Sequence, residues 1–102
     1  MIRVSVLYPN APGRKFDFDY YINKHKVMVH RLLDPIGLVR TEADRGIGTT
    51  QPGTPAPFVA VGYLYFNSME DFQKALPHAA KMMSDIPNFT DTQPQVQISE
   101  ML

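Results

Sequence analysis

The stretch from Asp17 to Leu33 most constrains how this chain can fold. Its apolar side chains recur at the three- and four-residue spacing of an amphipathic helix, and Asp17 is placed to cap the first turn. At about 100° per residue, one apolar stripe contains Phe18, Tyr21, Ile22, His25, Val29, Leu32, Leu33 and Ile36. The opposite, polar side contains Asp19, Asn23, Lys24, Lys26, His30, Arg31 and Asp34. The helix is expected to end near Asp34, because Pro35 and Gly37 follow.

His25 falls inside the apolar stripe of this helix. An imidazole in such a place must find a hydrogen-bond partner or face a cavity. Imidazoles exchange protons near neutral pH, so His25 is our candidate general acid or base. The alternative is a core or interface histidine whose only role is a hydrogen bond. His30 lies on the polar side and is expected at the surface.

Four segments have the composition and alternation of strands. They are residues 2–8, 38–44, 58–66 and 95–99. A second helix is predicted to begin after Ser68, which caps it, and to run to about Ile86 with a kink at Pro77. The Gly- and Pro-rich residues 46–57 are predicted to form a mobile loop and a candidate lid for a pocket. The element order is therefore βαββαβ.

This order predicts one domain, residues 1–102, with an α+β, ferredoxin-like fold. Two right-handed βαβ halves give a four-stranded antiparallel sheet with both helices on one face. The strand 58–66 is apolar on both of its faces, yet the two helices cover only one. We therefore expect a homodimer, in which a second copy stacks its sheet on the open face to make a dimeric α+β barrel.

Composition argues against several classes of partner. Ten basic and ten acidic residues give a net charge of zero, which disfavours nucleic acid and acidic membranes. No run of apolar residues approaches the roughly 20 needed to span a bilayer, and the N-terminus lacks the pattern of a secretion signal. The absence of cysteine suits a cytoplasmic protein. No ligand spacing for a metal and no nucleotide, flavin or haem motif is found, so we expect no metal and no cofactor.

Two motifs give the chain a family resemblance. The run Asp17-x-x-Tyr20-Tyr21-x-x-x-His25 precedes the central strand, and the segment Asp85-Ile86-Pro87-Asn88-Phe89-Thr90 follows it. Together they resemble the EthD family over essentially the whole chain. The resemblance implies a dimeric α+β barrel, often associated with oxidoreductase activity and with degradation of ethers such as ethyl tert-butyl ether. Some fungal relatives resemble cofactor-free dehydratases or cyclising enzymes of aromatic polyketides.

Candidate ligand-binding residues lie around His25. Tyr8, Tyr21 and Tyr65 carry hydroxyls that suit a mostly apolar pocket, although packing in the sheet or a dimer interface is the alternative for each. His78 is a further candidate, because we expect both helices to begin at the same end of the sheet and so to place His78 at a depth similar to that of His25. On the same expectation Asp85 lies roughly 10 Å or more further along, which makes it a poor partner for His25 unless the kink at Pro77 folds the second helix back. A capping or turn role is expected for it instead.

Two functions remain open from the sequence. The first is an enzyme, with His25 as the catalytic residue, that performs cofactor-independent oxidoreductase-type or acid/base chemistry on a small apolar or aromatic compound. The second is a non-catalytic ligand-binding or accessory protein that supports a separate oxygenase. A purely structural interaction module would be favoured if no pocket existed.

Overall fold

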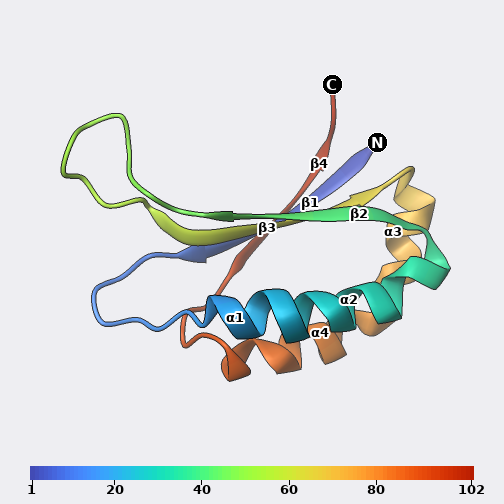
Figure 1. Ribbon diagram of the computed structural model, residues 1–102. Coiled ribbons are helices and arrows are strands. Elements are labelled where there is room, and N and C mark those ends of the chain that lie inside the picture. Colours follow the sequence, from blue (N-terminus) through green and yellow to red (C-terminus); the bar gives the residue numbers. More distant parts are fainter.

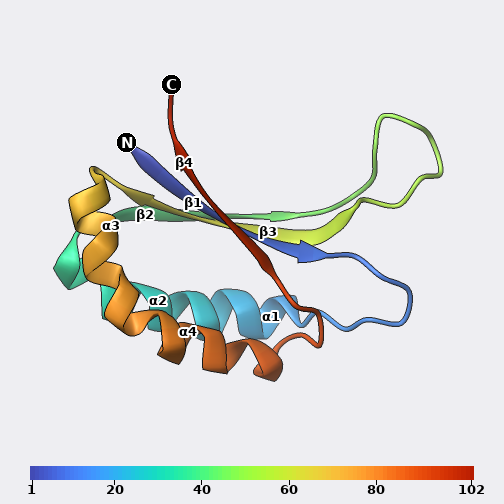
Figure 2. The same ribbon diagram turned by 180° about the vertical axis from the view of Figure 1, so that it is seen from behind.

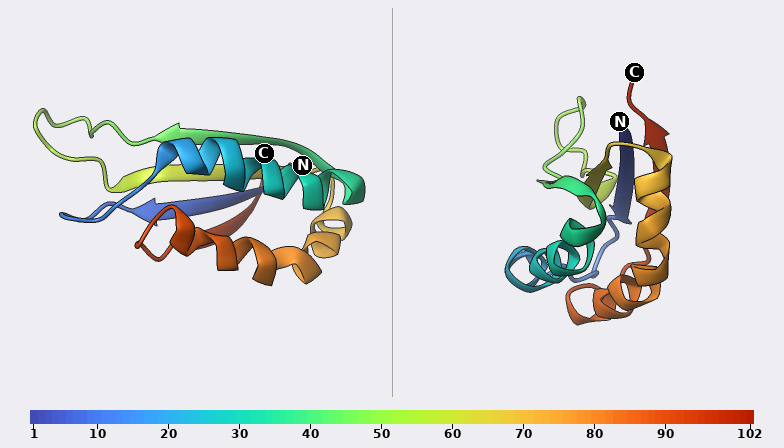
Figure 3. Two further views of the ribbon diagram at one scale, coloured as in Figure 1. Left: turned by 60° about the horizontal axis from the view of Figure 1, so that its bottom comes forward. Right: turned by 90° about the vertical axis from the view of Figure 1, so that its right-hand side faces the viewer.

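A computed structural model describes residues 1–102 as one sheet and two helical segments. The strands are β1 (Ile2–Pro9), β2 (Leu38–Arg45), β3 (Phe58–Phe66) and β4 (Gln95–Glu100). They form an antiparallel sheet in the order β2-β3-β1-β4. Both helical segments lie against the same face of this sheet, and the other face is bare (Figures 1 and 3). The predicted ferredoxin-like α+β fold is thereby confirmed.

The first helical segment contains a local change of geometry. It consists of α1 (Phe18–Tyr20), the π-helical turn η1 (Tyr21–His25), α2 (Lys26–Leu33) and the 3-10 turn η2 (Asp34–Ile36). Asp17 caps it as predicted, with Oδ1 accepting from the Tyr20 amide at 3.0 Å. In η1 the amide of Lys26 donates to the carbonyl of Tyr21, which is the i+5 spacing of a π-helix.

The π turn rotates later residues away from the uniform helical pattern. In an α-helix a residue five positions on is rotated by about 140° from the first, whereas an i+5 bond places it about one turn above. Ile22, predicted on the apolar stripe, is therefore 43% exposed. Lys26, predicted on the polar side, is half-buried and faces the sheet instead. The regular stripe was wrong at these two positions.

The second helical segment is broken at Pro77, as predicted. It consists of α3 (Met69–Ala75), the 3-10 turn η3 (Leu76–His78), α4 (Ala79–Asp85) and the 3-10 turn η4 (Ile86–Asn88). Ser68 caps α3 by accepting from the Asp71 amide at 3.1 Å. No helix in the chain is both long and apolar enough to cross a lipid bilayer.

The two helical segments run in opposite directions (Figure 2). Each segment follows one of two neighbouring strands, β1 and β3, and these strands are antiparallel. The helix that returns from β1 must therefore start at the opposite end of the sheet from the helix that returns from β3. The expectation that both helices begin at the same end was wrong, and this changes which residues meet between them.

The core is divided along the sheet. One cluster joins the N-terminal part of β1 to α2 and to the last residue of α3, Ala75, and includes the fully buried Leu33 and Phe66. The second is aromatic and lies where α1 and η4 come together, around Tyr8, Tyr21 and Phe89. The segment of residues 46–57 extends beyond the end of the sheet without helix or strand, as Figure 1 shows, so it is a loop as predicted. Its mobility stays a prediction. The aromatic cluster is where the candidate site is found.

Candidate functional site

His25 and Asp85 form a hydrogen-bonded pair between the two helical segments. The Nδ1 atom of His25 lies 2.8 Å from Oδ2 of Asp85, and their side chains are 10% and 16% exposed. The pair exists because α4 ends beside the beginning of the first helical segment. The prediction that Asp85 lies roughly 10 Å or more beyond His25 along the helix direction was therefore wrong. An antiparallel sheet already requires antiparallel helices, so strand direction was the signal that could have found Asp85.

The Asp85 carboxylate is held on both of its oxygens. Its Oδ1 atom accepts hydrogen bonds from the Tyr20 hydroxyl at 2.7 Å and from the Asn88 amide at 2.9 Å. Burial by itself raises the pKa of Asp85, but the hydrogen bonds from Asn88, Tyr20 and His25 outweigh it and leave the pKa below its usual value. In return, the hydrogen bond to Asp85 raises the pKa of the Tyr20 hydroxyl, with burial adding to it. Asp85 is therefore an ionised acceptor at neutral pH.

This pairing fixes which nitrogen of His25 carries the proton. An ionised carboxylate only accepts, so Nδ1 must donate to Asp85 and the neutral imidazole has its lone pair on Nε2. No side chain hydrogen-bonds to Nε2. The ring itself is held by stacking on Tyr21, with centroids 5.7 Å apart, and by Phe89 at 4.7 Å. A fixed imidazole with a free Nε2 is the arrangement of a general base.

Two tyrosine hydroxyls share the cavity with His25. Tyr8 is 2% and Tyr21 7% exposed, and their rings meet edge to face at 6.0 Å. The hydroxyls of Tyr20 and Tyr65 hydrogen-bond within the chain, whereas those of Tyr8 and Tyr21 have no such partner. Burial raises the pKa of Tyr21 to about 12, and burial together with the Tyr21 phenol raises that of Tyr8. Both groups therefore remain neutral hydrogen-bond donors at physiological pH.

The cavity lies between the first helical segment and the β2, β3 and β1 strands. Its volume is about 40 Å³, and it is lined by Val6, Tyr8, Tyr21, His25, Lys26, Val29, Thr41, Glu42, Ala43, Gly62, Tyr63 and Leu64. Gly62 has a specific role, because a Cβ atom there would collide with the Tyr21 hydroxyl. The missing side chain lets Tyr21 reach the sheet. This small, mostly apolar space holds room for a few water-sized groups.

Other predicted site residues lie elsewhere. Tyr65 is on the bare face of the sheet, where its hydroxyl donates to Glu42 at 2.6 Å. His78 is half-buried in η3 and does not line the cavity. No residue of the 46–57 loop lines it either, so the loop does not act as its lid here. No group of three or more His, Asp and Glu side chains is placed to hold a metal ion.

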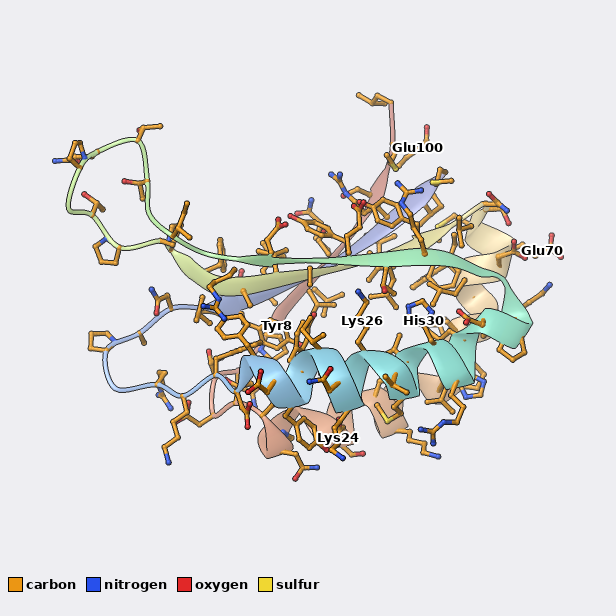
Figure 4. The ribbon with its side chains drawn as sticks, in the orientation of Figure 1. Tyr8, Lys24, Lys26, His30, Glu70 and Glu100 are labelled. Carbon is orange, nitrogen blue, oxygen red and sulfur yellow. The ribbon has the colours of Figure 1, made fainter.

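Lys26 is the lining residue that sequence reasoning missed. A regular helix places it on the polar side, and nothing in the sequence indicates the π turn that rotates it. In Figure 4 its side chain extends from α2 toward the strands, whereas that of Lys24 lies on the far side of the helix. Lys24 is exposed and Lys26 half-buried. The same helix thus carries one lysine at the cavity and one in solvent.

His30 is a second histidine paired with an aspartate. Its Nδ1 atom lies 2.8 Å from Oδ1 of Asp34, the same distance as in the His25 pair, but these side chains are 35% and 56% exposed. Its Nε2 atom is also occupied, because the Thr41 hydroxyl lies 2.7 Å away. His30 thus has both nitrogens engaged, and it does not line the cavity beside His25. It is the natural comparison for His25.

Comparison with known proteins gives a consistent result. A family model described as the EthD domain matches residues 13–93. A solved EthD-like protein from Ralstonia eutropha JMP134 is 35% identical, with a TM-score of 0.89 and coverage of 97% of this chain and 89% of that one. An EthD family protein from Bacillus halodurans C-125, whose family name refers to ethyl tert-butyl ether, is 22% identical, with a TM-score of 0.74 and coverage of 100% and 99%.

A more distant structure shares the fold alone. It is a dimeric ferredoxin-like protein from an uncultured marine organism, 12% identical, with a TM-score of 0.58 and coverage of 100% of this chain and 99% of that one. No curated protein matches the sequence.

Proposed function

The chain belongs to the EthD family, and from this premise we propose that it binds a small apolar or aromatic compound and transfers a proton on it without a cofactor. The observation that carries the proposal is the His25 imidazole, held at Nδ1 by Asp85 and free at Nε2 beside two unpartnered phenols. A proton acceptor and two proton donors thus share one small apolar space. Such a set of groups can remove a proton from the carbon next to a carbonyl group and donate hydrogen bonds to the carbonyl oxygen.

The proposed step conserves atoms and electrons. The Nε2 atom of His25 takes a proton from a carbon next to the carbonyl, so a C–H bond breaks and an N–H bond forms. The electron pair moves onto the carbonyl oxygen as an enolate. The hydroxyls of Tyr8 and Tyr21 donate to that oxygen as its charge grows, because their raised pKa values keep them protonated. The imidazolium then returns the proton to the same or another position.

Asp85 is a positioning residue in this scheme. It fixes the His25 tautomer and faces the positive charge that appears on the ring after proton transfer. Its second oxygen is held by Tyr20 and Asn88, so the carboxylate cannot easily turn away. Removal of the Asp85 charge should therefore slow proton transfer without removing the base itself.

The size of the cavity limits what it can enclose. At about 40 Å³ it is well below the roughly 300–1,000 Å³ of sites that bury a drug-sized ligand. The cavity of one chain therefore receives the reacting end of a small molecule. A group of a few heavy atoms can enter it, and the rest of the ligand must lie outside it.

We further propose that the protein forms a homodimer through the bare face of its sheet. That face carries the half-buried side chains of Leu7, Val61 and Tyr63, and no helix covers it (Figure 3). Apolar side chains at the centre of a sheet face favour burial against a second surface. The distant ferredoxin-like neighbour is itself described as dimeric. A second copy would supply such a surface.

Exchange of carbon-bound hydrogen for deuterium tests the proposed proton transfer. The purified protein is incubated in D₂O with a panel of small aromatic ketones and β-diketones, and exchange next to the carbonyl is followed by NMR. We expect His25→Gln to lose about 10²- to 10⁴-fold of the enzyme-dependent rate, the usual contribution of a general base. His30→Gln, which alters the other His–Asp pair on the same helix, should retain it.

Two results would decide against catalysis. Exchange that is unchanged in His25→Gln would remove His25 from the mechanism. Binding of the same compounds without any exchange by the unmodified protein would favour the non-catalytic ligand-binding or accessory role. A parallel panel of alkyl and aromatic ethers under air separates the oxidoreductase alternative, which requires consumption of oxygen along with the ether.

A further inference from the structure

The ammonium group of Lys26 is a positive charge without a counter-ion beside the cavity. Lys26 is half-buried and lines the cavity together with Tyr8, Tyr21 and His25. The ion pairs of the chain involve other cations, namely Arg14, His25, His30, Arg40 and Lys74. The ammonium group of Lys26 also donates no hydrogen bond to another side chain or to the backbone, unlike that of Lys74. Figure 4 shows its side chain lying between α2 and the sheet rather than extending into solvent.

Two further lining residues, Glu42 and Thr41, have polar side chains that are already hydrogen-bonded. Glu42 is the one carboxylate among the lining residues, but its carboxylate lies on the bare face of the sheet, where it accepts from the Tyr65 hydroxyl at 2.6 Å and lies 3.6 Å from Arg40. The Thr41 hydroxyl is bonded to His30 at 2.7 Å. Neither residue neutralises Lys26. The charge that faces the cavity from α2 is therefore positive.

We propose that the ligand of this cavity is a small organic acid whose carboxylate is bound by Lys26. The inference rests on the proposed function, because it names the class of compound on which His25 acts. A single lysine provides one positive charge, which matches a monoanion. A charge–charge contact at the edge of an apolar, low-dielectric space is stronger than the same contact in water.

Burial gives the ligand a direction. Tyr8, Tyr21 and His25 are each at least 93% buried, whereas Lys26 is only half-buried. The carboxylate thus stays near solvent at Lys26 and keeps part of its hydration, which limits the cost of burying a charge. The uncharged, reacting end of the molecule points inward to the two phenols and to Nε2 of His25. Lys26 determines specificity in this arrangement, and His25 performs the chemistry.

Binding of benzoate and of its neutral isostere benzamide tests the charge preference directly. Titrations followed by NMR of the His25 and Tyr21 ring signals report both affinity and location. We expect benzoate to bind at least about tenfold more tightly than benzamide, which corresponds to about 1.4 kcal/mol. Lys26→Met should reduce this ratio to near one. Lys24→Met, on the solvent side of the same helix, should leave it unchanged, and Lys26→Arg should retain most of it.

Each other outcome contradicts the inference. Equal affinity for benzoate and benzamide, the absence of benzoate binding at the ring signals, or an equal loss of the ratio in Lys24→Met would each overturn it. The readout is binding, so it is independent of turnover. A charge preference lost in Lys26→Met while His25→Gln shows no effect on deuterium exchange would leave the Lys26 site standing and remove only the proposed catalysis. Conversely, His25-dependent exchange on neutral ketones, combined with equal binding of benzoate and benzamide, would leave the proposed catalysis standing and remove the Lys26 site.

Discussion

The two nitrogens of His25 have different surroundings. Nδ1 is held by a carboxylate that itself accepts hydrogen bonds from Tyr20 and Asn88, whereas Nε2 has no hydrogen-bond partner within the chain. His30, five residues later, has both nitrogens engaged at the surface. The contrast between two histidines on one helix shows that burial and an unoccupied nitrogen, and not the presence of an aspartate, distinguish the candidate catalytic residue.

Asp85→Asn is expected to lower the free energy of unfolding by about 2 kcal/mol at pH 7, because three donors lose their charged acceptor. The pKa of Asp85 is lowered in the folded state from 3.8, so its stabilising contribution is fully present above pH 3.8 and is lost as the pH falls through the folded pKa. The difference between the two proteins should therefore shrink below pH 4. Urea unfolding at a series of pH values measures it.

The matched control for this change is Asp34→Asn. Asp34 is paired with His30 at the same distance but is 56% exposed, so its loss should cost under about 0.5 kcal/mol. Equal losses of unfolding free energy for the two substitutions would show that the buried Asp85 hydrogen bonds stabilise the fold no more than the exposed His30–Asp34 pair.

Gly62→Ala tests the close approach of Tyr21 to the sheet. The added methyl group would collide with the Tyr21 hydroxyl, and overpacking of this kind costs about 1–3 kcal/mol. In the Tyr21→Phe background the hydroxyl is gone, so the same glycine change should cost clearly less. A double-mutant cycle from thermal or urea unfolding gives the coupling. Additive losses would mean that Gly62 does not act through Tyr21.

At the scale of elements, the π turn and the direction of the helices build the site. The π turn places Tyr21 and Lys26 on the same side of the first helical segment. The antiparallel course of the two segments brings the end of α4 to His25 (Figure 2). The π turn amounts to one extra residue within an otherwise continuous helix. Deletion of one residue within the π turn should therefore be tolerated, whereas deletion of a residue in the neighbouring α-helix should not.

Deletion of Asn23 tests this interpretation. Asn23 is exposed and lies within the π turn, so its loss should convert the turn to α-helix while the residues on both sides keep their positions. We expect a loss of about 1 kcal/mol or less. Deletion of Val27, also exposed but in the regular helix α2, should rotate Asp17 through His25 by about 100° against the sheet and cost several times more. Thermal unfolding compares them, and similar losses would contradict the extra-residue account.

At the scale of the whole molecule, the sheet has one covered face and one bare face (Figure 3). Leu7 and Val61 pair across β1 and β3 on the bare side. Leu7→Lys should prevent the proposed dimer while leaving the helix-side core intact, because each copy would bring a lysine charge into the apolar face that is to be buried. Ile22→Lys, at an exposed position on the helices, should not affect it.

Sedimentation equilibrium at micromolar concentration checks this assembly. A dimer in the unmodified protein and in Ile22→Lys, with a monomer in Leu7→Lys, is the expected result. The melting temperature of the dimer should also rise with protein concentration, since association stabilises the folded state by mass action. A monomeric unmodified protein would exclude the dimer.

Local patterns were sufficient to predict much of this molecule. The alternation of β-branched residues indicated the strands, Asp17 and Ser68 marked helix starts, and Pro77 broke the second helix where expected. The position of His25 on an apolar stripe also singled it out. Each of these features depends on residues only a few positions apart in the chain, and the periodicity of the sequence shows such short-range relations directly.

The sequence by itself thus determined the elements, the ferredoxin-like order and the choice of His25. Only the tertiary structure decided that Asp85, sixty residues away, is the partner of His25, that Gly62 makes room for Tyr21, and that Lys26 faces the cavity. The first two relations join residues distant along the chain, and they depend on how strands and helices are directed and packed. The third depends on one additional residue in a helical turn. The apolar periodicity of the whole helix does not reveal such a local insertion, yet the insertion turns a charged side chain from solvent toward the cavity.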